Sequence, residues 1–462
     1  MLFNSLPFLY LFLPVTYFVF WRLHTKSQRY VWLTITGYIF YSFWNPKFCA
    51  LMALSTAVSY GAGLGFLRWK DARHRRLCLV LPIVFDLSLL AAFKYANFAL
   101  SSGNWLLQAL HLNFRAPSFD IVLPIGISFY TFHTITYIVD SYRDVITPTR
   151  NIFEFSCYVS LFSQLVAGPI VRFRQIERDL EDIDHPNRED DRERGWSFFV
   201  LGMVKKVLIA DSIAWIINPA LARWQSLSAF DTWLCMLGYT YQLYFDFSGY
   251  SDMAVGLGAM FGIRLPQNFN SPYKAADISD FWKRWHISLS SVLRDYLYIP
   301  LGGNRHGEWS TCRNLMVTML LGGLWHGANW TFVAWGAYHG ILLVATRYSQ
   351  SILTLWPTFL RKVTTFVVVI IGWVLFRSDN FSMASGLLAA MFSRKSGIHL
   401  DTARTLAGLL LIAGALAHFG PNTFELRHRW RPVPAFAFGV LMLVCIGFIY
   451  GGQQSPFLYF QF

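Results

Sequence analysis

Apolar runs about 20 residues long recur from one end of the chain to the other, and they constrain the fold more than any other feature. A helix of that length crosses the hydrocarbon core of a bilayer, because each residue advances it by about 1.5 Å. Only 14% of the 462 residues are charged, against about 25% in a soluble globular protein. The sequence therefore predicts an all-α polytopic membrane protein, with about eleven transmembrane helices.

The positive charge of the chain, formally +13, lies mostly in short loops between the apolar runs. Basic residues follow the first run (residues 5–22), and five Lys and Arg lie in residues 68–76, after the third run. The positive-inside rule places both loops in the cytoplasm. No phosphate-binding glycine loop, nucleic-acid module or metal-ligand spacing accompanies the charge, so we expect neither nucleic acid nor a metal.

The apolar stretch 152–170 has arginines on both sides, at Arg143 and Arg150 before it and at six positions between Arg172 and Arg194 after it. If both flanks are cytoplasmic, the stretch enters the membrane and returns to the same face. Such backbone is tolerated at membrane depth only when it is buried in protein or lines a cavity. We interpret residues 171–195, the most polar part of the chain, as a solvated cytoplasmic loop.

Residues 277–298 have the pattern of one amphipathic helix that lies along the membrane. Eight apolar residues recur there at helical spacing: Ile278, Phe281, Trp282, Trp285, Leu289, Val292, Leu293 and Tyr296. His286 falls on the border of this apolar stripe. A helix of this kind lies on a membrane face or closes a ring of spans from the cytoplasmic side.

The apolar run 314–345 is about 32 residues long, which is more than one span needs. Glycines before and after His326 indicate an interruption at this histidine. An ionisable side chain in such a run is a candidate functional residue, because leaving it uncompensated is costly. The same reasoning predicts that Asp246 and Asp252, in the apolar run 231–262, face the protein interior and have partners.

His286 and His326 allow three interpretations from chemistry alone. They are buried histidines satisfied by hydrogen bonds, metal ligands, or groups that transfer protons near neutral pH. Neither has a carboxylate or thiol at helical ligand spacing, which disfavours a metal. A proton relay in a transporter is the main rival of catalysis, although we find no internal repeat of the kind that transporters often have.

Several stretches resemble the membrane-bound O-acyltransferase family, and within it the alginate O-acetyltransferase branch. They are FWKRWHISLSSVLRDYLYIPLGGNR, LWHGANWTFVAWGAYHG, LPIGISFYTFHTITYIVDSYR, LVAGPIVRF, DFSGYSDMAVGLGAMFGIRLPQNFNSPY and PFLYFQF. The separation of His286 and His326 also matches the two-histidine arrangement of the family. Ser163, His133 and Val292 depart from its pattern, but the two histidines are intact.

The resemblance implies a ring of tilted spans with re-entrant and amphipathic helices around a central tunnel. It implies that His326 is the catalytic histidine and His286 its companion. We also expect five residues to bind substrates: Trp285, Trp325 and Asn329 along the tunnel, and Arg284 and Arg305 beside the donor. Packing is the alternative role of the two tryptophans, and the one that their apolar surroundings favour. The expected donor is acetyl-CoA, used as a substrate, with no permanently bound cofactor.

We expect one domain, 1–462, made of N-terminal spans (1–150), a catalytic core (151–345) and C-terminal spans (346–462). The resemblance implies acetyl transfer in a bacterial inner membrane to an exopolysaccharide, alginate- or cellulose-like. Expected partners are a periplasmic acetyltransferase or acetyl-carrier protein and a polysaccharide synthesis and secretion complex. The alternatives are a teichoic acid D-alanyl transferase and a transporter of polysaccharide precursors.

The charge pattern predicts that the loops 68–76 and 171–195 share the cytoplasmic face. Single cysteines in place of Arg73 and Arg188 are therefore expected to resist a membrane-impermeant thiol reagent in intact cells and to react in opened cells. Labelling of either position from outside would overturn the re-entrant assignment of residues 152–170.

Overall fold

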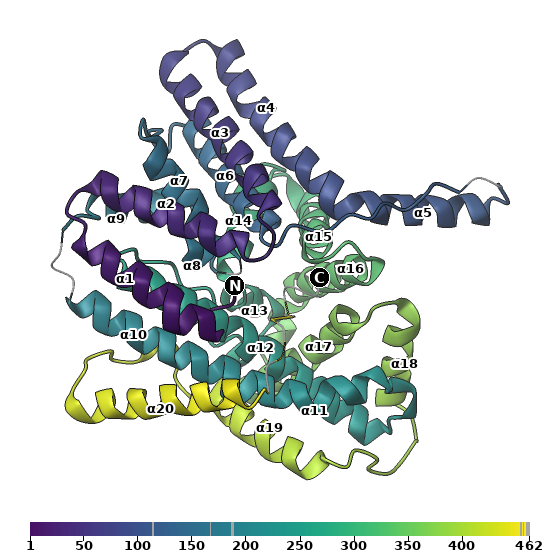
Figure 1. The fold of residues 1–462 in the computed structure, drawn as a ribbon. Helices are drawn as coiled ribbons and strands as arrows, with labels where there is room; N and C mark the ends of the chain where they lie inside the picture. The colour runs from purple at the N-terminus through teal and green to yellow at the C-terminus, as the bar shows by residue number, and fades with distance from the viewer. Residues whose placement is uncertain (113–114, 167, 186–188, 453–454, 456, 459–462) are drawn as a thin grey trace. The chain divides into compact units, whose positions relative to one another are not determined.

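The computed structural model describes residues 1–112, 115–166, 168–185, 189–452, 455 and 457–458. Throughout this part of the chain the regular secondary structure is helical (Figure 1), which confirms the all-α prediction. The chain divides into two compact units, Met1–Arg192 with Gly258–Leu265, and Glu193–Leu257 with Pro266–Phe462. The single-domain organisation stays a prediction. Arg188, in the loop 171–195, and Ala167, in the stretch LVAGPIVRF, lie outside the described residues.

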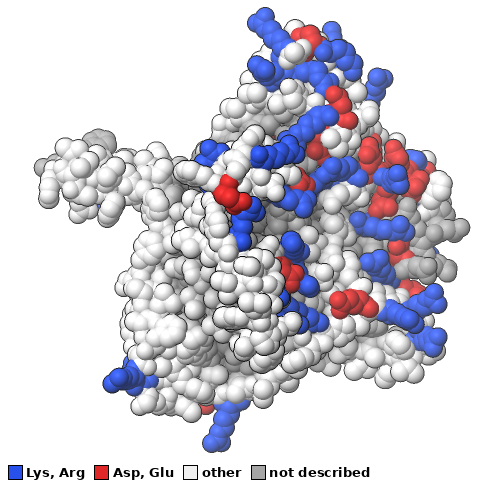
Figure 2. Space-filling model, turned by 180° about the vertical axis from the view of Figure 1, so that it is seen from behind, with Lys and Arg blue, Asp and Glu red and all other residues white. Residues whose placement is uncertain are grey.

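The first unit contains eleven elements within the described residues, in which η denotes a short π-helical or 3-10 segment. They are η1 (Phe8–Phe12), α1 (Leu13–Arg22), α2 (Lys26–Ser42), α3 (Lys47–Arg68), α4 (Ala72–Leu90), η2 (Ala91–Tyr95), α5 (Ala96–Ala109), α6 (Ile127–Tyr142), α7 (Ile152–Ser160), α8 (Phe162–Leu165) and α9 (Phe173–Glu181). Helices α3 and α4 run side by side, and α5 continues from the end of α4 as an arm (Figure 1). The arm shows almost no charged surface in Figure 2, as expected for a segment in contact with lipid.

The second unit holds both histidines. Its elements are α10 (Glu189–Met203, which starts at the end of the first unit), η3 (Val204–Ala210), α11 (Asp211–Ala222), η4 (Trp224–Ser226), α12 (Ala229–Met260), η5 (Pro272–Lys274), α13 (Ile278–Arg284), α14 (Ile287–Leu293), η6 (Arg294–Tyr298), α15 (Gly307–His326), α16 (Trp330–Leu353), α17 (Thr358–Arg377), α18 (Phe381–Met391), α19 (Ala403–His418), η7 (Thr423–Glu425) and α20 (Pro432–Tyr450). Helices α15 and α16 pack extensively against each other.

Within the described residues, four helices are long and apolar enough to cross a membrane: α3, the continuous segment Ala72–Ala109, α17 and α20. Three shorter apolar helices accompany them, Phe8–Arg22, Phe381–Met391 and Ala403–His418. This composition is that of a multi-pass membrane protein. The count of about eleven spans and their arrangement as a ring stay predictions.

Two of the predicted segments fold differently from our expectation. Residues 277–298 do not form one helix, because the chain breaks at Trp285 and His286 between α13 and α14. Residues 171–195 are not simply a solvated loop, because α9 buries Phe173, Ile176 and Leu180. Their spacing of three and four residues is that of a helix with one apolar face, which the many charges around them concealed.

Two other predictions are confirmed. The apolar run 314–345 is interrupted at the histidine, since α15 ends at His326 and α16 begins at Trp330. Asp246 and Asp252 are buried and paired, with Lys206 at 2.6 Å and Lys205 at 2.5 Å. The stretch 152–170 forms α7 and α8, most of whose side chains are buried, while its return to the same membrane face stays a prediction.

Helices α15 and α16 pack against each other through two glycines. A Cβ on Gly323 would lie 2.3 Å from the carbonyl oxygen of Phe332, and one on Gly336 would lie 2.3 Å from that of Met319. Both distances are far below van der Waals contact, so the two backbones approach as closely as only glycine permits. This contact fixes where the last turn of α15, and hence His326, lies.

We expect Gly323→Ala to destabilise the protein by about 1–3 kcal/mol, the usual cost of overpacking a close contact. The matched control is Gly408→Ala in α19, where a Cβ meets nothing within 4 Å. The midpoint of thermal unfolding in detergent should fall for the first variant and stay the same or rise for the second. Equal midpoints would show that the α15–α16 contact does not need this glycine.

Candidate functional site

His326 is the last residue of α15, and the turn that follows it is fixed at both ends. The backbone of Gly327 is extended, which ends the helix. Asn329 then caps α16: its side chain accepts a hydrogen bond from the amide of Thr331 at 3.1 Å and donates one to the carbonyl of Asp379 at 2.7 Å. The imidazole of His326 is therefore placed at a rigid junction of two helices.

His286 joins α13 to α14 in a left-handed backbone conformation, with φ of 45°. For a residue other than glycine this conformation costs about 1–3 kcal/mol, so the surrounding structure must hold it. Asn268 does so from the loop after α12. Its side-chain oxygen lies 3.1 Å from His286 Nδ1 and accepts hydrogen bonds from the amide and hydroxyl of Ser288, at 3.1 and 2.8 Å.

The contacts of Asn268 define the protonation of His286. Its oxygen is the acceptor for two Ser288 donors, so the third partner, His286 Nδ1, must also donate. The proton of the neutral ring then sits on Nδ1 and the lone pair on Nε2. His286 is completely buried, and burial lowers its pKa, which keeps the ring neutral.

The two imidazoles form the centre of an aromatic cluster. Their ring centroids are 6.2 Å apart, and Trp325 lies beside both, at 6.1 Å from His286 and 5.1 Å from His326. Trp335 and Phe376 meet the His326 ring edge to face, at 5.2 and 5.3 Å. Such packing restricts both rings to one orientation and excludes most of the space that water would fill.

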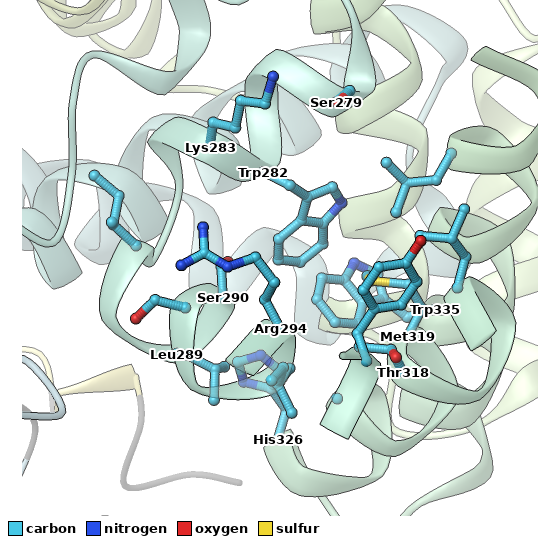
Figure 3. A pocket seen from close by; sticks show the side chains of 17 residues that line it. Ser279, Trp282, Lys283, Leu289, Ser290, Arg294, Thr318, Met319, His326 and Trp335 are labelled. Carbon is cyan, nitrogen blue, oxygen red and sulfur yellow. The ribbon is translucent and has the colours of Figure 1, made fainter. Parts of the chain in front are cut away.

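His326 borders a cavity of about 340 Å³, shown in Figure 3. The residues that line it come from α13, α14, η6, α15 and α16: Ser279, Trp282, Lys283, Ile287, Leu289, Ser290, Ser291, Leu293, Arg294, Tyr298, Leu315, Thr318, Met319, Gly322, His326, Trp335 and Leu343. Its size is that of a small-molecule site. His286 is not among the lining residues, so His326 is the histidine that faces the cavity.

The cavity combines an apolar wall with cationic side chains. Lys283 and Arg294 line it, and in Figure 3 Lys283 lies on the opposite side of the view from His326. Arg294 is paired with Asp295 at 2.7 Å and is well exposed. The arrangement suits an elongated ligand whose apolar body contacts the wall and whose reactive end reaches His326.

The five residues predicted to bind substrates lie outside this cavity lining. Trp285 is buried among Phe269, Trp373 and other rings, and Trp325 packs beside both histidines. Asn329 caps α16, Arg284 pairs with Asp280 at 2.7 Å, and Arg305 is exposed. Their roles toward substrates stay predictions.

Sequence reasoning did not single out Asn268, Lys283, Arg294 or Trp335 as site residues. Asn268 lies in the stretch FGIRLPQNFNSPY, which already carried the resemblance, but its role depends on a contact with His286, 18 residues away. Lys283 and Arg294 had a usable signal, since they lie on the polar side of the amphipathic segment. Trp335 lies in the stretch LWHGANWTFVAWGAYHG, which also carried the resemblance, but its role depends on a contact with the His326 ring.

Comparison with known proteins agrees with this site. The profile of the membrane-bound O-acyltransferase family matches residues 121–383, which contain both histidines. A probable alginate O-acetylase, AlgI, of Azotobacter vinelandii is 44% identical over 92% of this chain and 86% of its own length. The corresponding Pseudomonas putida protein is 40% identical over the full length of both chains. A peptidoglycan O-acetyltransferase of Helicobacter pylori is 37% identical over 85% of this chain and 80% of its own.

The protein is thus a multi-pass membrane enzyme of the acyltransferase class. More particularly, the chain belongs to the membrane-bound O-acyltransferase family, and its similarity to named O-acetyltransferases along most of its length makes it a membrane O-acetyltransferase.

Replacement of Asn268 by Ala should leave three buried donors without their acceptor. We expect this to lower the free energy of unfolding by about 1–3 kcal/mol, the cost of an unsatisfied buried polar group. Asn304→Ala, at an exposed position of a turn, is the matched control. Thermal unfolding in detergent measures both, and an equal midpoint for the two variants would contradict the role assigned to Asn268.

Proposed function

We propose that this protein transfers an acetyl group from acetyl-CoA at the cytoplasmic face of a bacterial inner membrane to an acceptor on the other side. The acceptor is an exopolysaccharide or a periplasmic protein that passes the acetyl group on. The observation that carries this proposal is the position of His326, which borders an amphipathic cavity with the neutral His286 at 6.2 Å behind it.

The chemistry requires one group that takes a proton and returns it. His326 removes the proton from the acceptor hydroxyl as its oxygen attacks the carbonyl carbon of the thioester. The C–O ester bond forms, the C–S bond breaks, and the departing thiolate takes the proton back from His326. The reaction is balanced, because an ester and a free thiol replace an alcohol and a thioester, and it needs no further reactant.

His286 supports this step without touching the substrate. With its proton on Nδ1 and donated to Asn268, the ring offers only a lone pair. A lone pair does not stabilise an oxyanion, but it does favour a cation. We therefore assign His286 the task of orienting His326 and stabilising its protonated form, in preference to polarising the thioester carbonyl.

Acetyl-CoA fits the chemistry of the cavity. Its pantetheine chain is long and uncharged, and its phosphates carry the negative charge that Lys283 and Arg294 favour at the cavity. Arg284 and Arg305 add basic charge to the same segment of the chain and remain proposed contacts of the donor. In this arrangement the donor stays on the cytoplasmic side and only its acetyl group crosses.

The names of the relatives, which specify alginate and peptidoglycan, support a sugar polymer as the acceptor. We therefore propose a polysaccharide hydroxyl as the final acceptor. An acetyl-carrying periplasmic protein and a polysaccharide synthesis and secretion complex are the proposed partners. Trp285, Trp325 and Asn329 are proposed to shape the path between the two substrates.

The central prediction is that His326→Ala abolishes acetyl transfer while the protein still inserts and folds. Loss of a general base lowers a rate by about 10²–10⁴-fold, whereas removing a polar group from this depth does not burden membrane insertion. The measurement is transfer of labelled acetyl from acetyl-CoA to polysaccharide or carrier protein, normalised to folded membrane protein. His286→Ala should lower the rate less, since its role is orientation.

His399→Ala removes an exposed histidine and is the matched control. Near-normal transfer by folded His326→Ala would contradict the catalytic assignment and return this residue to a structural one. Offering a D-alanyl carrier protein in place of acetyl-CoA separates the alternatives: transfer from that donor alone would favour the D-alanyl transferase. Polysaccharide movement without any acyl transfer would favour the transporter.

A further inference from the structure

A cluster of three charged side chains lies buried in the second unit, apart from the cavity. Lys206 is paired with Asp211 and with Asp246, each at 2.6 Å, and all three side chains are at most 2% exposed. Two carboxyl groups share one ammonium, so their remaining oxygen lone pairs need further hydrogen-bond donors. Because unpaired buried charge is costly, a cluster of this kind must receive further hydrogen bonds.

The end of the chain supplies these hydrogen bonds through its backbone. The amide of Leu458 donates to Asp246 at 3.0 Å, and the carbonyl of Ser455 accepts from Lys206 at 3.1 Å. The backbone of Ser455 also donates to Asp211. Each member of the cluster thus binds a main-chain group of what we call the tail segment, the described residues Ser455, Phe457 and Leu458.

The side chain of Phe457 continues from this anchor toward the histidines. It is completely buried and packs on α12, stacked on Tyr250 at 4.4 Å and 6.2 Å from Phe247. Phe247 in turn meets the ring of His286 edge to face at 4.7 Å. The tail segment therefore reaches His286 through a single intervening ring.

A buried ion cluster is a poor means of gaining stability, because apolar residues of similar volume serve as well or better. Its advantage is specificity, since it accepts main-chain groups in only one register. Here that register decides where Phe457 lies on α12. The position of Phe457 matters for His286, because the backbone of His286 is left-handed and its ring must be held in place by neighbouring side chains.

We infer that the tail segment is a positioning element of the catalytic site, anchored by Lys206, Asp211 and Asp246 and acting on His286 through Phe457 and Phe247. This inference rests on the proposed function for its effect on rate, but the docking of the tail segment does not. None of these residues touches the substrates. Their removal should change the turnover rate and leave the donor KM unaltered.

The docking is tested by digestion of the folded protein with a carboxypeptidase, followed by mass spectrometry. In the unaltered protein, trimming should stop before Leu458 is removed. Lys206→Met should let digestion continue past Ser455. Lys205→Met is the matched control: Lys205 makes an ion pair of the same kind with Asp252, at 2.5 Å, and also bonds Thr423, so its variant should stay resistant. The anchor would be overturned if all three proteins resisted digestion, or if all three were digested past Ser455.

The action on His286 is tested with Phe457→Ala, which keeps the ion cluster intact. We expect kcat for acetyl transfer to fall about 10- to 100-fold, as a displaced catalytic group would cause, with no change in KM for acetyl-CoA. If Phe457 acts through Phe247, adding Phe457→Ala to a Phe247→Ala variant should lower kcat little further. Independent effects that multiply, or an unchanged kcat in Phe457→Ala, would overturn the positioning role.

These two tests separate the inference from the proposed function. If the unaltered protein transfers no acetyl group, the proposed function fails, whereas the digestion experiment still decides whether the tail segment is anchored. If transfer occurs and the tail segment is resistant, but Phe457→Ala is fully active, only the positioning role fails.

Discussion

The close approach of α15 and α16 is the contact on which the rest of the site depends. It requires Gly323 and Gly336, since a methyl group at either would collide with the backbone of the other helix. The two helices together carry His326, Trp335 and most of one cavity wall. Because His326 is the last residue of α15, it gains the rigidity of a packed helix while its ring stays at a chain break open to a ligand.

The two histidines differ in what holds them, and this difference separates their tasks. His326 lies on the cavity and is confined by aromatic rings. His286 is held by Asn268, whose side-chain oxygen accepts the hydrogen bond from Nδ1 and thereby fixes the tautomer. A base must change its protonation during turnover, whereas an orienting group works better if it does not. The geometry therefore matches an active base supported by a fixed neighbour.

The buried charges of α12 are costly to desolvate, and they bear on where other parts of the chain pack against this helix. Asp246 and Asp252 lie six residues apart on one helix and pair with the adjacent lysines Lys206 and Lys205. Among the described residues, only the first pair also binds the tail segment. Burying such groups contributes little net stability, which is why we assign the cluster around Lys206 a role in positioning the tail segment.

The sequence by itself determined the class of fold and the residues at its centre. Apolar runs of membrane length predicted helices, the glycines around His326 predicted the break in the run 314–345, and the carboxylates of the run 231–262 predicted buried partners. These inferences succeed because helix formation, chain breaks and the cost of buried charge depend on local sequence. The resemblance through both histidines identified the family, which the comparisons confirmed.

Only the tertiary structure decided which side chains surround the histidines. The left-handed turn at His286 depends on Asn268, which is separated from it by 18 positions, and no periodicity contains that contact. The short apolar face of α9 is concealed in the sequence by the charges around it, and the break between α13 and α14 is concealed by a continuous apolar stripe. Lys206 and the tail segment are almost 250 residues apart. Contacts over such distances arise from packing, which local sequence does not specify.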